Sequence, residues 1–540
     1  MSTHNVEDVY GLSPLQFGML FHSLEDTSDT RPYMVQMTEQ IDGPFDPDCF
    51  RDAWQGLVDR HTILRSAFVW EGVSEPLQVV QRTARLPFAA QDWRHLPPGE
   101  REDRLRRFLA ADWDQGFDLS RAPLVRVTLL RTEEAQWIAV WSFHHILIDG
   151  WSVQILQSEL SMLYRSRLAG RTPVPQPPPI PFRRYIQWLG AQQPADAETF
   201  WTRYLSGMSG AAELGIERAV REVGGDVVPG GSEGTDTNGP ADRGIGEVEF
   251  VADEVFTTRA REYARQQRIT MNTLVQGVWS LLLSRYSGSD DIVFGSTVSG
   301  RSADLPGVDT MMGLFINTLP VRVKLDGAAR VGEWLRQVQD EQLDLRQWEH
   351  SHLVDVHKYS GIPRGEPLFR SILVFENYPV IPEAGDDGLP EGMTSKLIGC
   401  VERTGYPLTL VVSAGRDFEF RLVYDRSIYP DDAMRRLVVH LRTLLESVVD
   451  GEDAALVSGP GMVAGEELAS VVSGCNETAG WFPDGATIHG LIQDRAAASA
   501  GDVAVVCGDR SLTFGEVWDR AESLARHLVS AGVGPGSLVG

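Results

Sequence analysis

An apolar, aromatic-rich run, residues 137–143 (WIAVWSF), ends at two adjacent histidines. Its length and continuous apolar character are typical of a buried strand. Successive side chains on a strand point to opposite faces, so His144 and His145 diverge and only one of them faces a given cavity. Residues 149–150 (Asp-Gly) predict a turn, and residues 151–168 have helical apolar spacing. This stretch therefore predicts a strand–turn–helix unit with the histidines at the strand end, a frequent position for catalytic groups.

Three non-catalytic interpretations compete for these residues. A buried histidine satisfied by hydrogen bonds is the commonest fate of a single His. A metal site is disfavoured, because adjacent strand side chains diverge and no cluster of cysteines or carboxylates follows at ligand spacing. Asp149 is also suited to cap the following helix, which does not exclude catalysis nearby. An imidazole has its ordinary pKa close to neutrality, so either histidine suits proton transfer.

Length and charge limit the class of protein. A chain of 540 residues exceeds the usual limit for one core, and 42% hydrophobic residues suffice for two or three domains. The formal net charge is −26, from 49 basic and 75 acidic residues. Nucleic acids and anionic membranes require clustered lysine and arginine, so we expect neither as a partner.

Cysteine usage and the start of the chain bear on the compartment. The four cysteines are widely spaced without a CxxC pair, which predicts neither a zinc site nor a disulfide framework. The N-terminal residues lack the basic and apolar regions of a signal peptide, and no apolar run reaches the roughly 20 residues that span a bilayer. We therefore expect a cytoplasmic protein.

Composition also marks the breaks between segments. Proline-rich residues 170–182 favour extended backbone and predict a junction between two lobes. Gly-rich residues 206–246 predict a long mobile loop. Further on, residues 247–250 and 292–298 have strand patterns and residues 256–286 a helical one, so the chain is expected to be mixed α/β.

The whole string His-His-x-x-x-Asp-Gly at 144–150 resembles the signature of condensation domains of nonribosomal peptide synthetases, members of the chloramphenicol acetyltransferase-like superfamily. Five further stretches resemble motifs of that family in the family's order: residues 12–24 (LSPLQFGMLFHSL), 60–68 (RHTILRSAF), 290–301 (DDIVFGSTVSGR), 312–323 (MGLFINTLPVRV) and 366–379 (EPLFRSILVFENYP). The sequence departs from the pattern at Thr62, where a glutamate is usual, and the first stretch is not the "SxAQxRLW" version, which leaves the donor stereochemistry open.

The resemblance implies two acetyltransferase-like lobes in a V-shaped pseudo-dimer with an active-site tunnel between them. Residues 1–175 then form the N-terminal lobe and residues 176–450 the C-terminal lobe. Residues 451–485, rich in Gly, Ala, Ser and Val, are expected to be a linker. Residues 486–540 resemble the opening of an adenylation domain through LTFGEV at 512–517. The nucleotide-binding motifs of that family lie further on, so we expect this piece neither to bind ATP nor to activate an amino acid; whether the chain is truncated or part of an assembly line stays open.

The resemblance also implies a reaction. A donor acyl or peptidyl thioester arrives on the phosphopantetheine arm of an upstream carrier protein, and an acceptor aminoacyl thioester arrives on a downstream carrier. The acceptor amine attacks the donor carbonyl, and an amide forms. No cofactor bound to the chain and no metal is expected, and the partners are the two carriers and the adjacent adenylation domain.

Site residues follow from the same resemblance. His145 matches the residue that handles the proton, as a general base or by orienting the amine. Asp149 is expected to be structural and to pair with Arg301. Gly150 would let a pantetheine arm approach, although an ordinary turn glycine is as consistent with the local sequence.

Four more residues are expected around the site. His144 is expected in its wall, packed or hydrogen-bonded. Arg60 and Arg65 resemble family arginines that hold the framework, with an exposed pair on a helix as the alternative. Asn317 is a candidate for lining the tunnel near the acceptor, and the alternative is a strand asparagine that bonds to its own sheet neighbours.

Other activities compete with condensation. An epimerisation domain shares the histidine string but adds a glutamate base in the second lobe, for which residues 349–350 (Glu-His) and 376–377 (Glu-Asn) are weak candidates. Heterocyclisation domains carry a two-aspartate motif instead, and free-standing acetyltransferases of one lobe are about half as long. A non-catalytic carrier-docking module typically loses the histidine string. We therefore predict a peptide-bond-forming acyltransferase.

Overall fold

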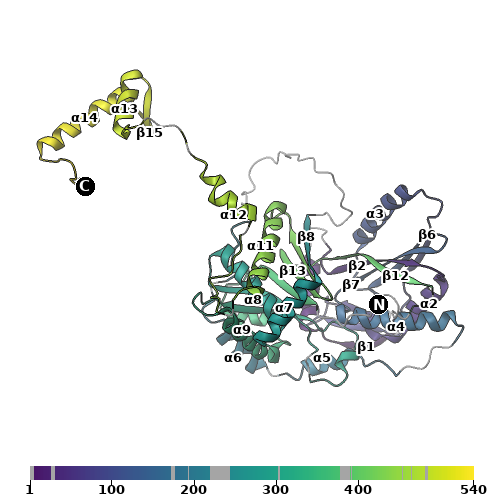
Figure 1. Ribbon diagram of the computed structural model, residues 1–540. Coiled ribbons are helices and arrows are strands. Elements are labelled where there is room, and N and C mark those ends of the chain that lie inside the picture. The colour runs from purple at the N-terminus through teal and green to yellow at the C-terminus, as the bar shows by residue number, and fades with distance from the viewer. Residues whose placement is uncertain are drawn as a thin grey trace. The chain divides into compact units, whose positions relative to one another are not determined.

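The structure, a computed structural model, divides into two compact units, Met1–Val463 and Ala464–Gly540 (Figure 1). It describes residues 5–25, 31–171, 177–192, 194–208, 210–218, 244–301, 304–376, 389–390, 392–452, 454–463, 465–478, 480 and 484–540. Most of the loop expected at residues 206–246, and part of the proline-rich junction at residues 170–182, lie outside these residues.

The first unit contains a five-stranded sheet with the order β12-β2-β7-β6-β5. These strands are Thr394–Glu402, Met34–Asp42, Gln136–His144, Val125–Glu133 and Phe88–Asp92. The central strand β7 is buried on both faces, since Trp137, Trp141 and Phe143 pack toward α2 (Pro47–Arg60) and α4 (Gly150–Leu168), while its alternate residues pack toward α3 (Pro98–Gln115). Figure 1 shows α3 and the α2–α4 pair on opposite sides of this sheet. Its apolar run is explained by the two covered faces.

Beside it lies a three-stranded sheet with the order β1-β4-β3. Its strands are Val6–Tyr10, Leu77–Gln81 and Ser66–Val69. The remaining short helices of the unit are α1 (Pro14–Glu25), η2 (Thr62–Arg65), α5 (Arg183–Leu189), α6 (Pro194–Tyr204), η3 (Val308–Thr310), η4 (Arg346–Trp348) and α10 (Leu353–Ser360).

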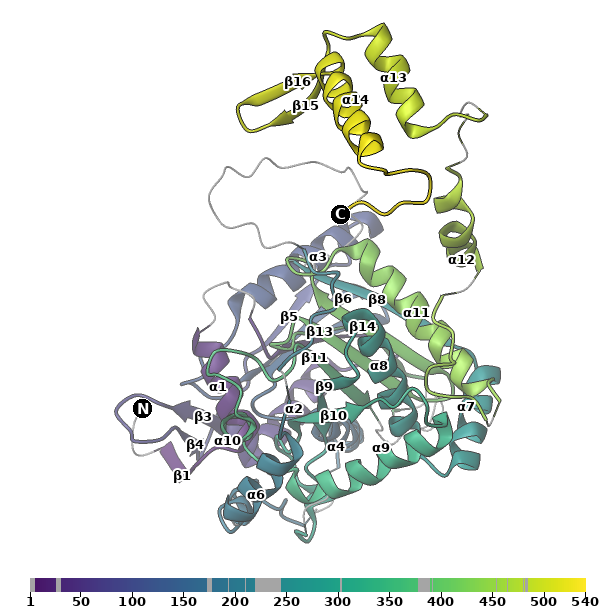
Figure 2. The same ribbon diagram turned by 90° about the vertical axis from the view of Figure 1, so that its left-hand side faces the viewer.

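A second, six-stranded sheet has the order β10-β9-β11-β13-β14-β8. These strands are Asn317–Lys324, Asp291–Val298, Ser371–Glu376, Leu408–Ala414, Phe418–Asp425 and Ile245–Ala252. Helices α7 (Glu254–Gln267), α8 (Met271–Ser287), α9 (Val331–Leu345) and α11 (Asp431–Val449) share its core. Figure 2 shows α8 and α11 lying across these strands. The mixed α/β class predicted from the sequence is confirmed.

The helix expected over residues 256–286 is two helices. Helix α7 ends at Gln267, and its C-cap Arg268 has a φ of 58°, in the left-handed region. Helix α8 begins after Thr270, whose hydroxyl oxygen accepts a hydrogen bond from the Thr273 amide. A left-handed residue followed by a threonine N-cap stops one helix and starts the next. The apolar period continues through the break because both helices face the same core.

Strand β12 departs from the expected division of the lobes at residue 176. It follows β11 of the second sheet in the chain but pairs antiparallel with β2, at the edge of the first sheet. In the register, Val35 lies opposite Glu402 on one side and opposite Phe143 on the other. This crossing brings the end of β12 close to the end of β7, where the two histidines lie.

The linker expected at residues 451–485 begins later than its composition suggests. Val457 is buried in the core beneath the six-stranded sheet, and the Val331 amide donates to the Ala455 carbonyl oxygen. Helix α12 (Gly465–Val472) and η5 (Gly474–Asn476) lie inside the expected linker. The second unit continues with α13 (Ile488–Ala498), a hairpin of β15 (Val503–Cys507) and β16 (Arg510–Thr513), and α14 (Phe514–Ser530), which starts at a capping box.

Two further observations concern the described residues only. None of their helices combines the length and the apolar character needed to cross a bilayer. All four cysteines, Cys49, Cys400, Cys475 and Cys507, are free thiols.

Candidate functional site

A cavity of about 1380 Å³ lies inside the first unit, lined by residues from both sheets. His145 and Gly150 line it from the strand–turn–helix unit, and Asn317 lines it from β10. Its walls also include Tyr33, Thr318, Glu376, Cys400, Glu402, Tyr406 and Arg421. Sites for drug-sized molecules commonly have 300–1,000 Å³. The cavity is therefore large enough for a substantial organic substrate.

The two histidines leave the strand end in different directions. The His144 ring is buried, its Nδ1 accepts a hydrogen bond from the Ile146 amide at 3.2 Å, and its Nε2 lies 3.4 Å from the Ser23 hydroxyl. Burial, with a smaller effect of neighbouring His145, lowers the pKa of His144 to about 3. His144 is therefore a neutral, hydrogen-bonded part of the wall.

His145 instead presents its Nε2 to a carboxylate. Nε2 lies 3.4 Å from Oε1 of Glu402, the last residue of β12, while Nδ1 has no hydrogen-bond partner in any other described residue. Although burial opposes the charged imidazole, the Glu402 hydrogen bond and charge raise the pKa of His145 above its usual value. The same pairing, helped by the charge of Arg421, holds the pKa of Glu402 below its usual value despite burial. The pair is an imidazolium–carboxylate contact on the cavity wall.

The backbone around Tyr33 holds these two side chains together. The Tyr33 carbonyl oxygen accepts from the His145 amide at 2.7 Å, and the Tyr33 amide donates to the Arg403 carbonyl oxygen at 3.0 Å. Tyr33 has a φ of 64°, a left-handed conformation that a bulky side chain rarely adopts. Its hydroxyl lies 2.7 Å from Nδ1 of His22. Such conformations persist where the surroundings over-determine them and cluster at functional sites.

Asp149 does not face the cavity. Its carboxylate is fully buried and accepts from the Ser152 amide at 2.8 Å and the Phe315 amide at 2.9 Å. The structure brings it together with Arg301, whose Nη2 lies 3.1 Å from Oδ1. Arg301 also donates to the carbonyl oxygens of residues 308 and 311 and lies over the Phe315 ring at 4.1 Å. The ion pair thus clamps the start of α4 to the segment before β10.

Gly150 is the first residue of α4, directly after the Asp149 cap, and lines the cavity. Asn317 lines it too, but its amide nitrogen donates to the carbonyl oxygens of Glu349 and Ser351 at 2.9 and 2.7 Å. Its side-chain oxygen accepts from the Thr318 amide. The Asn317 side chain therefore braces β10 against the loop that follows η4.

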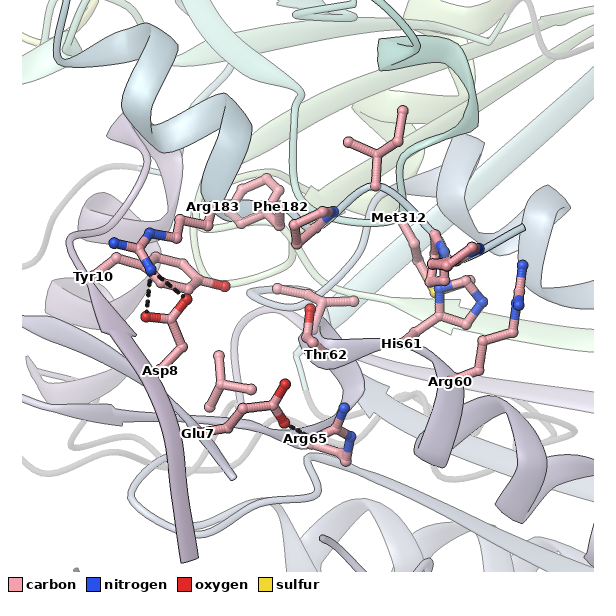
Figure 3. A pocket seen from close by; sticks show the side chains of 16 residues that line it. Glu7, Asp8, Tyr10, Arg60, His61, Thr62, Arg65, Phe182, Arg183 and Met312 are labelled. Atoms are coloured by element: carbon pink, nitrogen blue, oxygen red, sulfur yellow. Dashed lines mark hydrogen bonds and ion pairs between the residues drawn. The ribbon is translucent and has the colours of Figure 1, made fainter. Parts of the chain in front are cut away.

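Arg60 and Arg65 lie elsewhere. Both line a separate cavity of about 330 Å³, which shares no described lining residue with the large one (Figure 3). Arg60 pairs with Glu159 at 3.0 Å, and Arg65 pairs with Glu7 at 2.6 Å. Figure 3 shows the neighbouring Arg183 similarly paired with Asp8. Helices α2 and η2 carry the two arginines to this second cavity, and the expectation that they hold the framework of the histidine site stays a prediction.

The structure also shows where Glu349 and Glu376, the weak candidates for the glutamate base of an epimerase, lie. Glu376 lines the large cavity and accepts from the Ser413 hydroxyl at 2.6 Å, whereas Asn377 lies outside the described residues. The ring of His350, next to Glu349, packs against the rings of Trp188 and Trp348. The carboxylate that contacts His145 is instead that of Glu402. Sequence reasoning missed Glu402 because it belongs to no recognised string, and only the β12–β2 register places it.

The cavity wall offers three chemical groups near the strand end. They are the imidazole of His145, a carboxylate that contacts its Nε2, and a buried ion pair that supports the turn next to them. No group of three or more His, Cys, Asp or Glu side chains in the described part of the chain is arranged to hold a metal ion.

Comparison with known proteins identifies this arrangement. The condensation domain family matches residues 6–458, which is most of the chain. This chain belongs to the condensation domain family. Members of the family are acyltransferases that form peptide bonds, and the family predicted from the sequence is confirmed.

Relatives of this condensation domain are found in peptide synthetases. One protein of the linear gramicidin synthase of Brevibacillus parabrevis is 38% identical over 538 residues, which cover 99% of this chain but 7% of the relative. Tyrocidine synthase 2 of the same organism is 31% identical over 541 residues, covering 14% of that protein. The chain thus spans a small part of the length of the curated relatives it matches.

Solved structures share the fold of this condensation domain. The X-domain in complex with OxyB from teicoplanin biosynthesis has a TM-score of 0.68 at 22% identity, covering 86% of this chain and 98% of that chain. Its likeness confirms the predicted two-lobed fold. The family match ends before residue 486, so the adenylation-like character of residues 486–540 stays a prediction.

Proposed function

We propose that this chain forms an amide bond between a donor acyl or peptidyl thioester and the amine of an acceptor aminoacyl thioester. The donor would be carried by an upstream carrier protein and the acceptor by a downstream one, each on a phosphopantetheine arm. The observation that supports this most is the cavity of about 1380 Å³, where the imidazole of His145 faces space large enough for both reacting groups. The two relatives named above, both from peptide synthetases, support the same substrate class.

The chemistry requires a neutral amine, a group that accepts its proton, and stabilisation of the oxyanion. His145 is our candidate for the proton, because its Nε2 lies on the cavity wall and imidazole titrates near neutrality. A positioned general base contributes about 10²–10⁴ in rate. Orientation of the amine by the same nitrogen would act in the same direction.

The other site residues would act indirectly. Asp149 and Arg301 would hold the turn that carries His145, and His144 would fill the wall behind it. Gly150 would leave room for a pantetheine arm at the start of α4, and Asn317 would keep β10 in place beside the acceptor. None of these side chains is proposed to transfer a proton.

We place the reaction in the cytoplasm, where carrier-bound thioesters are made and the thiols of the chain stay reduced. Residues 486–540 would be the start of an adjacent adenylation domain. The catalytic unit itself would need neither metal nor bound cofactor.

Epimerisation of a carrier-bound peptide is a second candidate, favoured by one observation. Glu402 puts a carboxylate 3.4 Å from Nε2 of His145, so two proton-handling groups share one wall. An epimerase removes the α-proton of the bound residue and returns it on the other face. Exchange of that proton with deuterated solvent would therefore distinguish the two activities.

The test is a mass-spectrometric condensation assay with a donor aminoacyl carrier protein and an acceptor aminoacyl thioester. We expect wild type to form the amide and His145→Ala to slow it by about 10²–10⁴ with folding intact. Asp149→Ala should instead lose about 3–5 kcal/mol of stability, because Arg301 would be left buried and unpaired. Deuterium uptake without amide would favour epimerisation, and carrier binding without either reaction would favour a docking module.

A further inference from the structure

Glu402 is placed for a function that the reaction above leaves unassigned. It is the last residue of β12, it lines the large cavity, and 37% of its side chain is exposed. The carboxylate and Nε2 of His145 are 3.4 Å apart and line the same cavity. Two hydrogen-bond acceptors at this spacing can contact one nitrogen that carries several protons.

Three titratable groups surround the carboxylate of Glu402. Glu376 of β11 and Cys400 of β12 lie beside it, and Arg421 of β14 is the neighbouring cation. Burial and the nearby charge of Glu402 raise the pKa of the Cys400 thiol to about 12, so it stays neutral. Burial raises the pKa of Glu376 above its usual value as well. Glu402 is therefore the carboxylate of this wall that contacts His145, and this pairing holds its pKa below the usual value despite partial burial.

The position of this carboxylate is fixed through the backbone. Tyr33 accepts from the His145 amide with its carbonyl oxygen and donates its own amide to Arg403, the residue after Glu402. The ends of β7 and β12 are thus joined through one residue held in the left-handed region. These two backbone hydrogen bonds therefore hold the side chains of His145 and Glu402 in contact.

We infer that Glu402 binds the acceptor's amino group and positions it on Nε2 of His145. This inference rests on the proposed function, which supplies an acceptor amine. An α-amino group has an ordinary pKa of about 7.7–8.0, so much of it arrives as ammonium at neutral pH. The ammonium takes the place of the imidazolium as the cation of Glu402. The imidazolium releases its proton to water, so that neutral His145 can accept one.

The protons and electron pairs then balance. The bound ammonium loses its extra proton to Nε2 of neutral His145, which passes it to water. The nitrogen lone pair forms the C–N bond while the carbonyl π pair moves to oxygen. The oxyanion pair then re-forms the C=O bond as the C–S bond breaks. Sulfur leaves with the electron pair of the C–S bond and receives, through Nε2, the proton that nitrogen gives up. The products are an amide and a thiol, and Glu402 stays ionised throughout.

Glu402→Gln tests the assignment, since it keeps the shape of the side chain and removes its charge. A hydrogen bond to a charged group is lost, so we expect KM for the acceptor to rise about 10- to 100-fold while KM for the donor is unchanged. The pKa of His145 should fall, because the imidazolium loses its counter-ion, and the acid limb of kcat/KM should move to lower pH. Glu402→Asp should recover part of the acceptor affinity.

The matched control is Glu39→Gln. Glu39 is a half-buried carboxyl on β2 that accepts from Trp141 and Ser395 and lies outside the cavity lining. We expect this variant to leave both KM values and the His145 pKa unchanged. If Glu402→Gln behaves like Glu39→Gln in KM and in pH profile, the inference is overturned.

A binding experiment separates this inference from the proposed function. His145 is followed by NMR in protein with labelled histidines while an aminoacyl N-acetylcysteamine thioester, or its N-acetylated analogue without an ammonium, is added. We expect wild type to bind the amine form more tightly and Glu402→Gln to lose that preference. This result without amide formation would reject the proposed function and retain the inference; equal binding of both compounds by wild type would reject the inference.

Discussion

Adjacent His144 and His145 differ in chemistry because the strand alternates its side chains. His144 is enclosed by Ser23 and the Ile146 amide and is held neutral, whereas His145 faces the cavity and Glu402. Residue identity alone does not assign these roles. The period of a strand predicts that the rings diverge, and the packing around each ring decides which one is reactive.

The buried His144 makes stability depend on pH. Its pKa is lowered to about 3 in the folded chain, against about 6.5 when unfolded. Between these values the unfolded chain binds a proton that the folded chain excludes. The free energy of unfolding therefore falls as pH decreases through this window, by up to about 1.4 kcal/mol per pH unit.

His144→Asn checks this expectation, because an amide oxygen can accept from Ile146 without titrating. Urea unfolding of both proteins should show a shallower decline between pH 6.5 and about 4 for the variant than for wild type. Parallel curves would show that His144 is not the group responsible.

Among the site residues, the pairing of Asp149 with Arg301 was expected from the motif strings, and the structure places them 3.1 Å apart. Arg60 and Arg65 were expected at the same site but line another cavity. Glu402 was not expected at all. A motif preserves the local spacing of residues, but it does not say which cavity a helix end reaches or which carboxylate a distant strand supplies.

Among the helices and strands, local signals predicted the strand before the histidines and the helix after them. The break between α7 and α8 was missed, because the apolar period runs through Arg268 and Thr270 without interruption. Capping chemistry, rather than hydrophobic period, separates these helices.

Replacing Arg268 by glycine should stabilise the protein. The side chain is exposed and its backbone φ is 58°, where a Cβ atom is strained and glycine is not. Relief of this strain outweighs the added flexibility of the unfolded chain, so we expect a gain of up to about 1 kcal/mol in the free energy of unfolding.

Arg268→Ala is the control, since it removes the charged group but keeps the Cβ atom. Denaturant unfolding should show a gain for glycine and none for alanine. An equal gain in both variants would assign the effect to the side chain rather than to the backbone conformation.

Across the full chain, the large cavity belongs to the first unit alone. Its lining residues lie between Pro14 and Arg421, while the second unit starts at Ala464. The fold that forms the site is therefore complete within the first unit.

A chain of residues 1–463 should consequently keep the melting temperature of the first unit and the rate of amide formation with soluble thioester substrates. Calorimetry and the condensation assay on the shortened and full chains check this. A loss of several degrees, or of activity, in the shortened chain would show that residues 464–540 support the site.

Local patterns in the sequence were enough to predict the family, the mixed α/β class, the strand–turn–helix unit and the residue types at its end. Those features depend on period, caps and motif spacing, which act over a few residues. The folded chain was needed to show that β12 joins the first sheet, that Glu402 faces His145 and that Arg60 and Arg65 do not. Contacts such as the one between Ser395 and Glu39, separated by 356 positions, form through the packing of the whole chain, and no local pattern records them.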